Sequence, residues 1–258
     1  MVERTTYSDG EPCWADVVAG DVGAAMEFYE ALFGWTYAET GPEFGNYLMA
    51  QRNGRTVAGI SPPPPGGEEP PSAWTLYLAT HDLDATAQRV DQGGGKIALG
   101  PLDIADQGRM LFAIDPTGAP FGIWQSRGHL GFGVYGEQGA PCWAELNTRD
   151  GEGADVFYRT LFDYDQRQLG DGNQFDYTVW SLAGENHCGR LLMTDPRDGI
   201  PPNWMIYFAV DDTDAAADRA RLAGGQLQHP PLDSAQGRLA VLSDPNGAVF
   251  AIIDPSSR

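Results

Sequence analysis

The chain has 258 residues, 42% of them hydrophobic, and a formal net charge of −20 at pH 7. So acidic a surface repels nucleic-acid phosphates and anionic membranes, which excludes both as expected partners. No apolar run approaches the roughly 20 residues of a membrane span, and Met1-Val2-Glu3-Arg4 lacks the apolar core of a signal peptide, so we expect a cytoplasmic protein.

Residues 12–19 alternate in the manner of a β-strand. Cys13, Ala15 and Val17 share one apolar face, whereas Trp14 and Asp16 share the other. Because the sequence that follows is helical, we expect the helix to cover the first face. Trp14 and Asp16 then face away from the helix.

The segment after this strand predicts one helix and three short strands. Asp21 fits a helix N-cap, apolar residues follow at helical spacing, and Gly34 ends the helix. The predicted strands are 35–38, 44–51 and 55–60. The unit therefore has the order βαβββ.

The same order begins again after a Pro/Gly/Glu-rich linker at 62–71. The predicted elements are a strand at 74–80, a helix at 83–92, and strands at 97–99, 109–114 and 119–125. A glycine-rich segment at 126–140 then leads to a second half.

The second half repeats the first. Pro12-Cys13-Trp14-Ala15 returns as Pro141-Cys142-Trp143-Ala144, and Gln107-Gly108-Arg109 returns as Gln236-Gly237-Arg238, so 141 − 12 and 236 − 107 both give 129. The chain is therefore a tandem duplication. We expect domains at 1–126 and 141–258 joined by a linker at 127–140. The expected elements of the second half are strands at 143–147, 175–181 and 187–192, a helix at 154–162, a linker at 195–202, a strand at 204–210, a helix at 215–223, and strands at 238–243 and 249–254.

Paired βαβββ units, a Phe-Tyr pair on the first helix of each half and a terminal Asp-Pro-x-Gly-Ala turn resemble the vicinal oxygen chelate superfamily. Its members include glyoxalase I, extradiol dioxygenases, fosfomycin-resistance enzymes and bleomycin-resistance proteins, and the chain is similar to two-domain actinobacterial members labelled glyoxalase-like or hydroxylase. The resemblance implies an α+β fold in which four βαβββ modules form two glyoxalase-like domains. Their curled sheets would enclose cavities, where a metal usually lies.

The resemblance also implies three metal-ligand places in each half, and this chain departs from all of them. The residues at these places are Trp14, Thr75 and Gly122 in the first half and Trp143, Met205 and Ala251 in the second. None is an ordinary ligand for a divalent ion. The four histidines, His81, His129, His187 and His229, share no ligand spacing and are interpreted as surface or edge residues. Cys13, Cys142 and Cys188 have no paired spacing, so they predict neither a disulfide framework nor a zinc site. We expect no metal and no cofactor.

The predicted cavities each combine tryptophan, tyrosine and one acid, which suits a flat, hydrophobic, hydrogen-bonding ligand. The alternative is that the tryptophans are plain core. The candidate ligand-binding residues are Trp14, Tyr77, Arg109, Trp124, Trp143, Trp204, Tyr207 and Arg238.

Asp16 and Glu145 are the candidate catalytic residues. An acid buried beside tryptophan has a raised pKa and could act as acid, base or hydrogen-bond partner. The alternative is a structural ion pair with Arg109 or Arg238, although these arginines could also bind a ligand carboxylate or phenolate. Because Met205 and Ile253 make the second cavity more apolar, we expect the pKa of Glu145 to be the more perturbed.

The leading hypothesis is a metal-independent protein that binds an aromatic or polycyclic small molecule, in antibiotic resistance or secondary metabolism. It would sequester the molecule or transform it by acid/base chemistry. One alternative is a metal-dependent glyoxalase- or dioxygenase-like enzyme with an atypical site, in which case it would be a lyase, an isomerase or a hydroxylase-type enzyme. Another is a protein-interaction module. Since a fused duplication commonly replaces a symmetric dimer, the chain is expected to be a monomeric pseudo-dimer or a homodimer.

Overall fold

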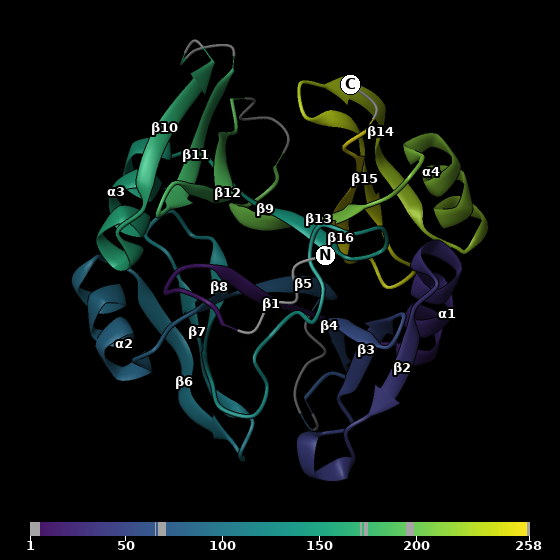
Figure 1. Cartoon of the computed structure of the whole chain (residues 1–258), viewed down its shortest axis with the longest axis horizontal. Coiled ribbons are helices and arrows are strands. Elements are labelled where there is room, and N and C mark those ends of the chain that lie inside the picture. Colours follow the sequence, from purple (N-terminus) through teal and green to yellow (C-terminus); the bar gives the residue numbers. More distant parts are fainter. Residues whose placement is uncertain are drawn as a thin grey trace.

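The computed structural model describes residues 6–64, 66, 71–170, 172, 175–194 and 199–256. It contains four βαβββ units in succession, two in each half of the chain (Figure 1). The first half consists of β1 (Pro12–Val18), α1 (Val22–Phe33), β2 (Thr36–Glu39), β3 (Leu48–Arg52), β4 (Arg55–Ser61), β5 (Ala73–Ala79), α2 (Leu83–Gln92), β6 (Lys96–Ile104), β7 (Gly108–Ile114) and β8 (Pro120–Ser126). The second consists of β9 (Pro141–Thr148), α3 (Gly151–Phe162), β10 (Asp165–Gly170), β11 (Asp176–Leu182), β12 (Glu185–Leu192), β13 (Asn203–Ala209), α4 (Thr213–Leu222), β14 (Gln226–Ser234), β15 (Gly237–Ser243) and β16 (Val249–Asp254).

Each half forms one eight-stranded mixed sheet. The strand order is β2-β3-β4-β1-β5-β8-β7-β6 in the first half and β10-β11-β12-β9-β13-β16-β15-β14 in the second. The two units of a half join through their first strands, β1 with β5 and β9 with β13, which pair antiparallel. The sheets are curled but remain open, because their outermost strands do not pair with each other. The expected α+β fold of four duplicated modules is confirmed.

The helices begin where the sequence indicates. The side chains of Asp21, Asp82, Asp150 and Asp212 each accept a hydrogen bond from a backbone N–H of the first turn. This capping satisfies donors that an unfinished first turn leaves without partners. Gly34, in the left-handed conformation with φ 68°, ends α1 as expected.

The two halves share one hydrophobic core. α1 packs against α4 of the other half, and α2 packs against α3 (Figure 1). The ring of Phe33 on α1 lies 5.0 Å from that of Phe208 on β13, and the two sheets meet where β5 contacts β13 and β16. Most buried apolar residues of both halves belong to a single contiguous cluster. Each half therefore uses the other to cover its helix layer.

The segment that joins the halves runs back over the first sheet. The backbone N–H of Phe132 donates to the carbonyl of Cys13 at 2.8 Å, and that of Gly133 donates to Thr56 at the same distance. Phe132 is almost completely buried, with 1% of its surface exposed. Phe132 and Gly133 thus bind to the first half, whereas Gly139 and Ala140 form backbone hydrogen bonds with Ala209 of the second. In the part of the chain that the structure describes, no helix is long and apolar enough to cross a membrane.

Candidate functional site

The carboxylate of Asp16 lies at the centre of a hydrogen-bonded group on the sheet face away from the helices. Strand alternation places Asp16 there beside Trp14, as expected. Asp16 Oδ2 accepts from the Tyr47 hydroxyl at 3.1 Å and from the Tyr77 hydroxyl at 3.0 Å. Trp14 Nε1 in turn donates to the Tyr47 oxygen at 2.7 Å. We call these four residues the first acid cluster.

The second half repeats this arrangement with a longer acid. Glu145 Oε1 accepts from the Tyr207 hydroxyl at 3.0 Å, and the nearby Tyr177 hydroxyl helps to lower the pKa of the Glu145 carboxyl. Trp143 Nε1 donates to the Tyr177 oxygen at 2.8 Å. Trp143, Glu145, Tyr177 and Tyr207 form the second acid cluster. Two copies of one polar network have therefore persisted through the divergence of the halves.

Glycines make room for the phenol rings. A Cβ added at Gly59 would collide with the Tyr47 hydroxyl, and one at Gly189 would collide with Tyr177. Neither Tyr47 nor Tyr177 was predicted from the sequence. The available signal was a shared spacing, since the glycine follows its tyrosine by 12 residues in both halves (59 − 47 and 189 − 177).

Both acids have strongly raised pKa values because they are buried. Burial raises the pKa of Asp16 from 3.8 to about 7 and that of Glu145 from 4.5 to about 7. Hydrogen bonds from the tyrosines favour the ionised forms and oppose this increase. Both pKa values are therefore raised to about 7, and the larger perturbation predicted for Glu145 is not seen.

The joining segment covers Trp14, the neighbour of Asp16 in the first acid cluster. The His129 ring meets the Trp14 ring edge-on at a centroid distance of 4.4 Å, and Phe132 lies against the same indole at 5.6 Å. The Trp124 indole donates to the His129 carbonyl at 2.9 Å. Burial lowers the pKa of His129 to about 4, which keeps the imidazole neutral near pH 7. His129 is thus a component of the first site and not the surface residue that the sequence suggested.

The second site is lined by apolar side chains, as its sequence indicated. Tyr207, Ala251 and Ile253 are buried together, and five partly buried residues pack against them. These are Cys142, Trp143, Met205, Leu239 and Val241. The two sites therefore offer the same polar network in different surroundings.

The arginines predicted to bind ligand pair with other carboxylates. The Arg109 guanidinium binds Asp84 on α2 with two hydrogen bonds, at 2.8 and 3.0 Å. Arg238 likewise binds Asp214 on α4 and Asp233. The acids of both clusters are held by tyrosine hydroxyls, so the alternative of an ion pair between Asp16 and Arg109 or between Glu145 and Arg238 does not describe this structure.

Trp204 lies outside the acid clusters. Its indole donates to the Tyr158 hydroxyl at 3.0 Å on the helix side of the sheet, within the core shared by the halves. The other predicted aromatic residues, Trp14, Tyr77, Trp124, Trp143 and Tyr207, lie in or beside the acid clusters.

The donor groups do not fit a bound divalent metal. Within the described ranges, no three His, Cys, Asp or Glu side chains come together as a metal site would require. The Tyr77 ring occupies the space that a side chain at position 122 would need. What remains in each cluster is one carboxylic acid beside two phenols, whereas selective divalent-ion sites need several oxygen or nitrogen ligands.

The family models that match the chain cover both halves. Residues 13–123 match the model of the Glyoxalase/Bleomycin resistance protein/Dioxygenase superfamily, and residues 143–253 match that of a glyoxalase-like domain. CFP32 of Mycobacterium tuberculosis, which carries a provisional glyoxylase name, is 41% identical over 99% of both chains. The anthracycline biosynthesis protein DauV of Streptomyces sp. strain C5 is 34% identical over 97% of this chain and 95% of its own.

Solved structures with the same fold include a metal-bound glyoxalase and a dioxygenase. The Mn(II)-bound glyoxalase of Novosphingobium aromaticivorans matches with a TM-score of 0.66 at 16% identity, covering 97% of this chain and 85% of that one. The 2,3-dioxygenase LapB of Pseudomonas sp. KL28 matches with a TM-score of 0.65 at 11% identity, covering 96% and 93%. At such identities the likeness concerns the fold alone.

Proposed function

Because the chain belongs to the glyoxalase/bleomycin resistance protein/dioxygenase superfamily, we propose that it binds an aromatic or polycyclic small molecule without a bound metal. The observation that carries this proposal is the duplicated acid cluster, in which one carboxylic acid is hydrogen-bonded to tyrosine beside a tryptophan. Aromatic side chains supply stacking surface, and the acid supplies a hydrogen-bond partner for a hydroxyl or carbonyl group.

The relatives support this class of ligand. Two proteins that are 34% identical to the chain over 97% of its length are named for anthracycline biosynthesis. An anthracycline has a planar polycyclic core that carries hydroxyl and quinone oxygens. Such a core combines a flat apolar face with polar edges, which is what the two clusters could recognise.

The acids also provide the means for proton transfer. With a pKa of about 7, Asp16 and Glu145 exchange protons near neutral pH, where both forms are present. The protein would therefore either sequester its ligand or catalyse a proton transfer on it, for example between a phenol and its keto tautomer. Neither role requires a metal.

The test is a titration of the metal-stripped protein with a hydroxyanthraquinone, followed by quenching of tryptophan fluorescence. We expect saturable quenching and an affinity that falls at least tenfold in the double variant Asp16→Asn/Glu145→Gln. The single variants report on each cluster, and Asp91→Asn, which changes an exposed carboxylate on α2, is the control. Recovery of the ligand and its mass spectrum distinguish sequestration from transformation.

Two results would count against this proposal. Equal affinity in the double variant and the wild type would leave the acids with a structural role only. Binding that appears only after addition of a divalent metal would favour the metal-dependent alternative.

We also propose that the protein is cytoplasmic and monomeric. The monomer is expected because the contact between its halves resembles the symmetric interface of a dimer. Light scattering coupled to size exclusion should give a mass near the 27.9 kDa of one chain. Twice that mass would indicate a homodimer.

A further inference from the structure

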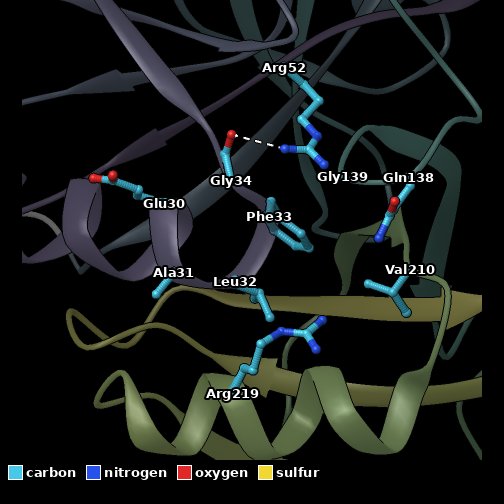
Figure 2. A pocket seen from close by; sticks show the side chains of 10 residues that line it. All are labelled: Glu30, Ala31, Leu32, Phe33, Gly34, Arg52, Gln138, Gly139, Val210 and Arg219. Atoms are coloured by element: carbon cyan, nitrogen blue, oxygen red, sulfur yellow. Dashed lines mark hydrogen bonds between the residues drawn. The ribbon is translucent and has the colours of Figure 1, made fainter.

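A cavity of about 340 Å³ lies between the halves on the helix side of the molecule (Figure 2), and no residue of either acid cluster lines it. The C-terminal end of α1, β3, the joining segment and α4 all contribute to it. Its apolar lining includes Phe33 and Val210, and its polar lining includes Arg52, Gln138 and Arg219. The volume lies within the range of small-molecule sites.

Arg52 reaches the cavity from the first half. Its Nη1 donates to the carbonyl of Gly34 at 3.2 Å, whereas its buried Nε has no hydrogen-bond partner among the described residues. Glycines at 34 and 139 leave space for the guanidinium, because a Cβ at Gly34 would collide with Nη1. Both glycines have positive φ angles, 68° and 75°, so a larger residue would be strained at either position.

Arg219 approaches the same cavity from α4 of the second half. Figure 2 shows the two guanidinium groups on opposite sides of the cavity and the Gln138 amide beside them, while the Glu30 carboxylate points away. The exposed Arg219 side chain forms no ion pair with a described residue. A cation in the last turn of α4 also complements the helix dipole, so its charge alone would not indicate a ligand. The presence of a second arginine, Arg52, in the lining of the same cavity does, in a chain whose net charge is −20.

We propose that this cavity is a second ligand site, which binds a small organic anion with a carboxylate or phosphate group. Guanidinium groups bind such oxyanions through paired charge-assisted hydrogen bonds. The anionic group would lie between Arg52 and Arg219, and an apolar body would lie against Phe33 and Val210. The site is independent of the acid clusters and of the ligand proposed for them.

The duplication supplies an internal comparison. At the equivalent positions of the other helix junction, Leu182 replaces Arg52 (182 − 52 is 130) and Asp9 replaces Gln138 (138 − 9 is 129). Only Arg219 has a basic counterpart. This is Arg89, which lies 130 residues earlier in the chain (219 − 89). One such site per chain is therefore expected, and Arg89 is a matched control.

The test is calorimetry with phenyl phosphate, benzoate and inorganic phosphate, at constant ionic strength with chloride as the reference anion. We expect one equivalent of phenyl phosphate or benzoate to bind per chain, and tighter than inorganic phosphate, which lacks the apolar body. Arg219→Gln and Arg52→Gln should each weaken binding about tenfold, and Arg89→Gln should leave it unchanged. Comparison of the two organic anions shows which oxyanion is preferred.

Absence of saturable binding for all three anions, or equal binding in Arg219→Gln and the wild type, would overturn the proposal. If Arg52→Gln does not fold, Arg219→Gln still tests the proposal, because the Arg219 side chain is exposed. Hydroxyanthraquinone binding should be unaffected in Arg219→Gln. Phenyl phosphate binding should likewise persist in Asp16→Asn/Glu145→Gln, so that the two proposals fail separately.

Discussion

The hydroxyl of Tyr29 in the first half lies 3.1 Å from the Asp244 carboxylate in the second. The reciprocal pair, Tyr158 and Asp115, has the same separation of 3.1 Å. Each tyrosine lies on the first helix of its half, and each aspartate lies in the turn before the last strand of the other. These reciprocal contacts are what a pseudo-twofold relation between the halves produces.

Tyr29→Phe should therefore lower the stability of the whole chain. The change removes the bond to Asp244 and leaves the Trp74 indole, which donates to Tyr29 at 3.0 Å, without an acceptor. We expect a loss of about 1–3 kcal/mol in a single urea transition. Tyr37→Phe, which removes a hydroxyl bonded within the first half, is the control. Two separate transitions in the wild type would contradict the shared core.

The contribution of the buried acid Asp16 to stability should fall as pH rises. Below about pH 4, Asp16 is protonated in both the folded and the unfolded chain and has no effect. Between about pH 4 and pH 7 only the unfolded chain ionises at this position, since burial holds the pKa of Asp16 at about 7 in the folded state. Raising the pKa from 3.8 to about 7 then costs roughly 4 kcal/mol at pH 8.

Asp16→Asn removes this contribution. The free energy of unfolding of the variant minus that of the wild type should thus increase from pH 4 to pH 7 and then level off. Denaturant unfolding at each pH gives this difference, with Asp91→Asn as the control. A difference that is independent of pH would show that Asp16 does not have a raised pKa.

Tyr47 and Tyr77 should lower the pKa of Asp16. Their hydroxyls donate to the carboxylate and stabilise its ionised form. Tyr47→Phe removes one donor, so we expect the pKa of Asp16 to rise by about 1. Carboxyl ¹³C NMR titration measures this value directly, and Tyr37→Phe is again the control. A pKa that falls or does not change would mean that Tyr47 does not stabilise the carboxylate.

Metal analysis of the purified protein should find well under one Zn, Ni, Fe or Mn per chain. The reason is the donor set, since Trp14, Thr75 and Gly122 provide no ordinary ligand site and the Tyr77 ring covers Gly122. Purification without chelators followed by elemental analysis tests this expectation. One ion per half, held after dialysis, would refute it.

The sequence predicted most of the fold because its apolar periodicities are strong and occur twice. Two strands of the second half, β10 and β14, were not predicted. β14 contains Pro230-Pro231, and both are outermost strands rich in polar residues. An edge strand tolerates proline because one row of its backbone groups has no partner strand, so sequence patterns identify such strands poorly.

The sequence predicted part of the candidate site. It did not reveal contacts between residues that are distant in the chain. Alternation along a single strand identified Asp16 and Glu145 correctly as residues away from the helix face. Tyr47 and Tyr177 belong to other strands, and their contacts depend on register, which a short apolar segment does not reveal. Arg109 and Arg238 recur together in the sequence, but so do their partners Asp84 and Asp214, and duplication copies structural pairs as faithfully as ligand contacts.

The joining of both halves in one chain changes what substitution can do. In a homodimer every mutation appears at both symmetry-related positions, so two identical sites must change together. Here a codon change affects one position only, which allowed aspartate at 16 and glutamate at 145, and tryptophan at 124 and isoleucine at 253. One acid cluster could thus keep its residues while the other changed, with neither subunit exchange nor a second gene.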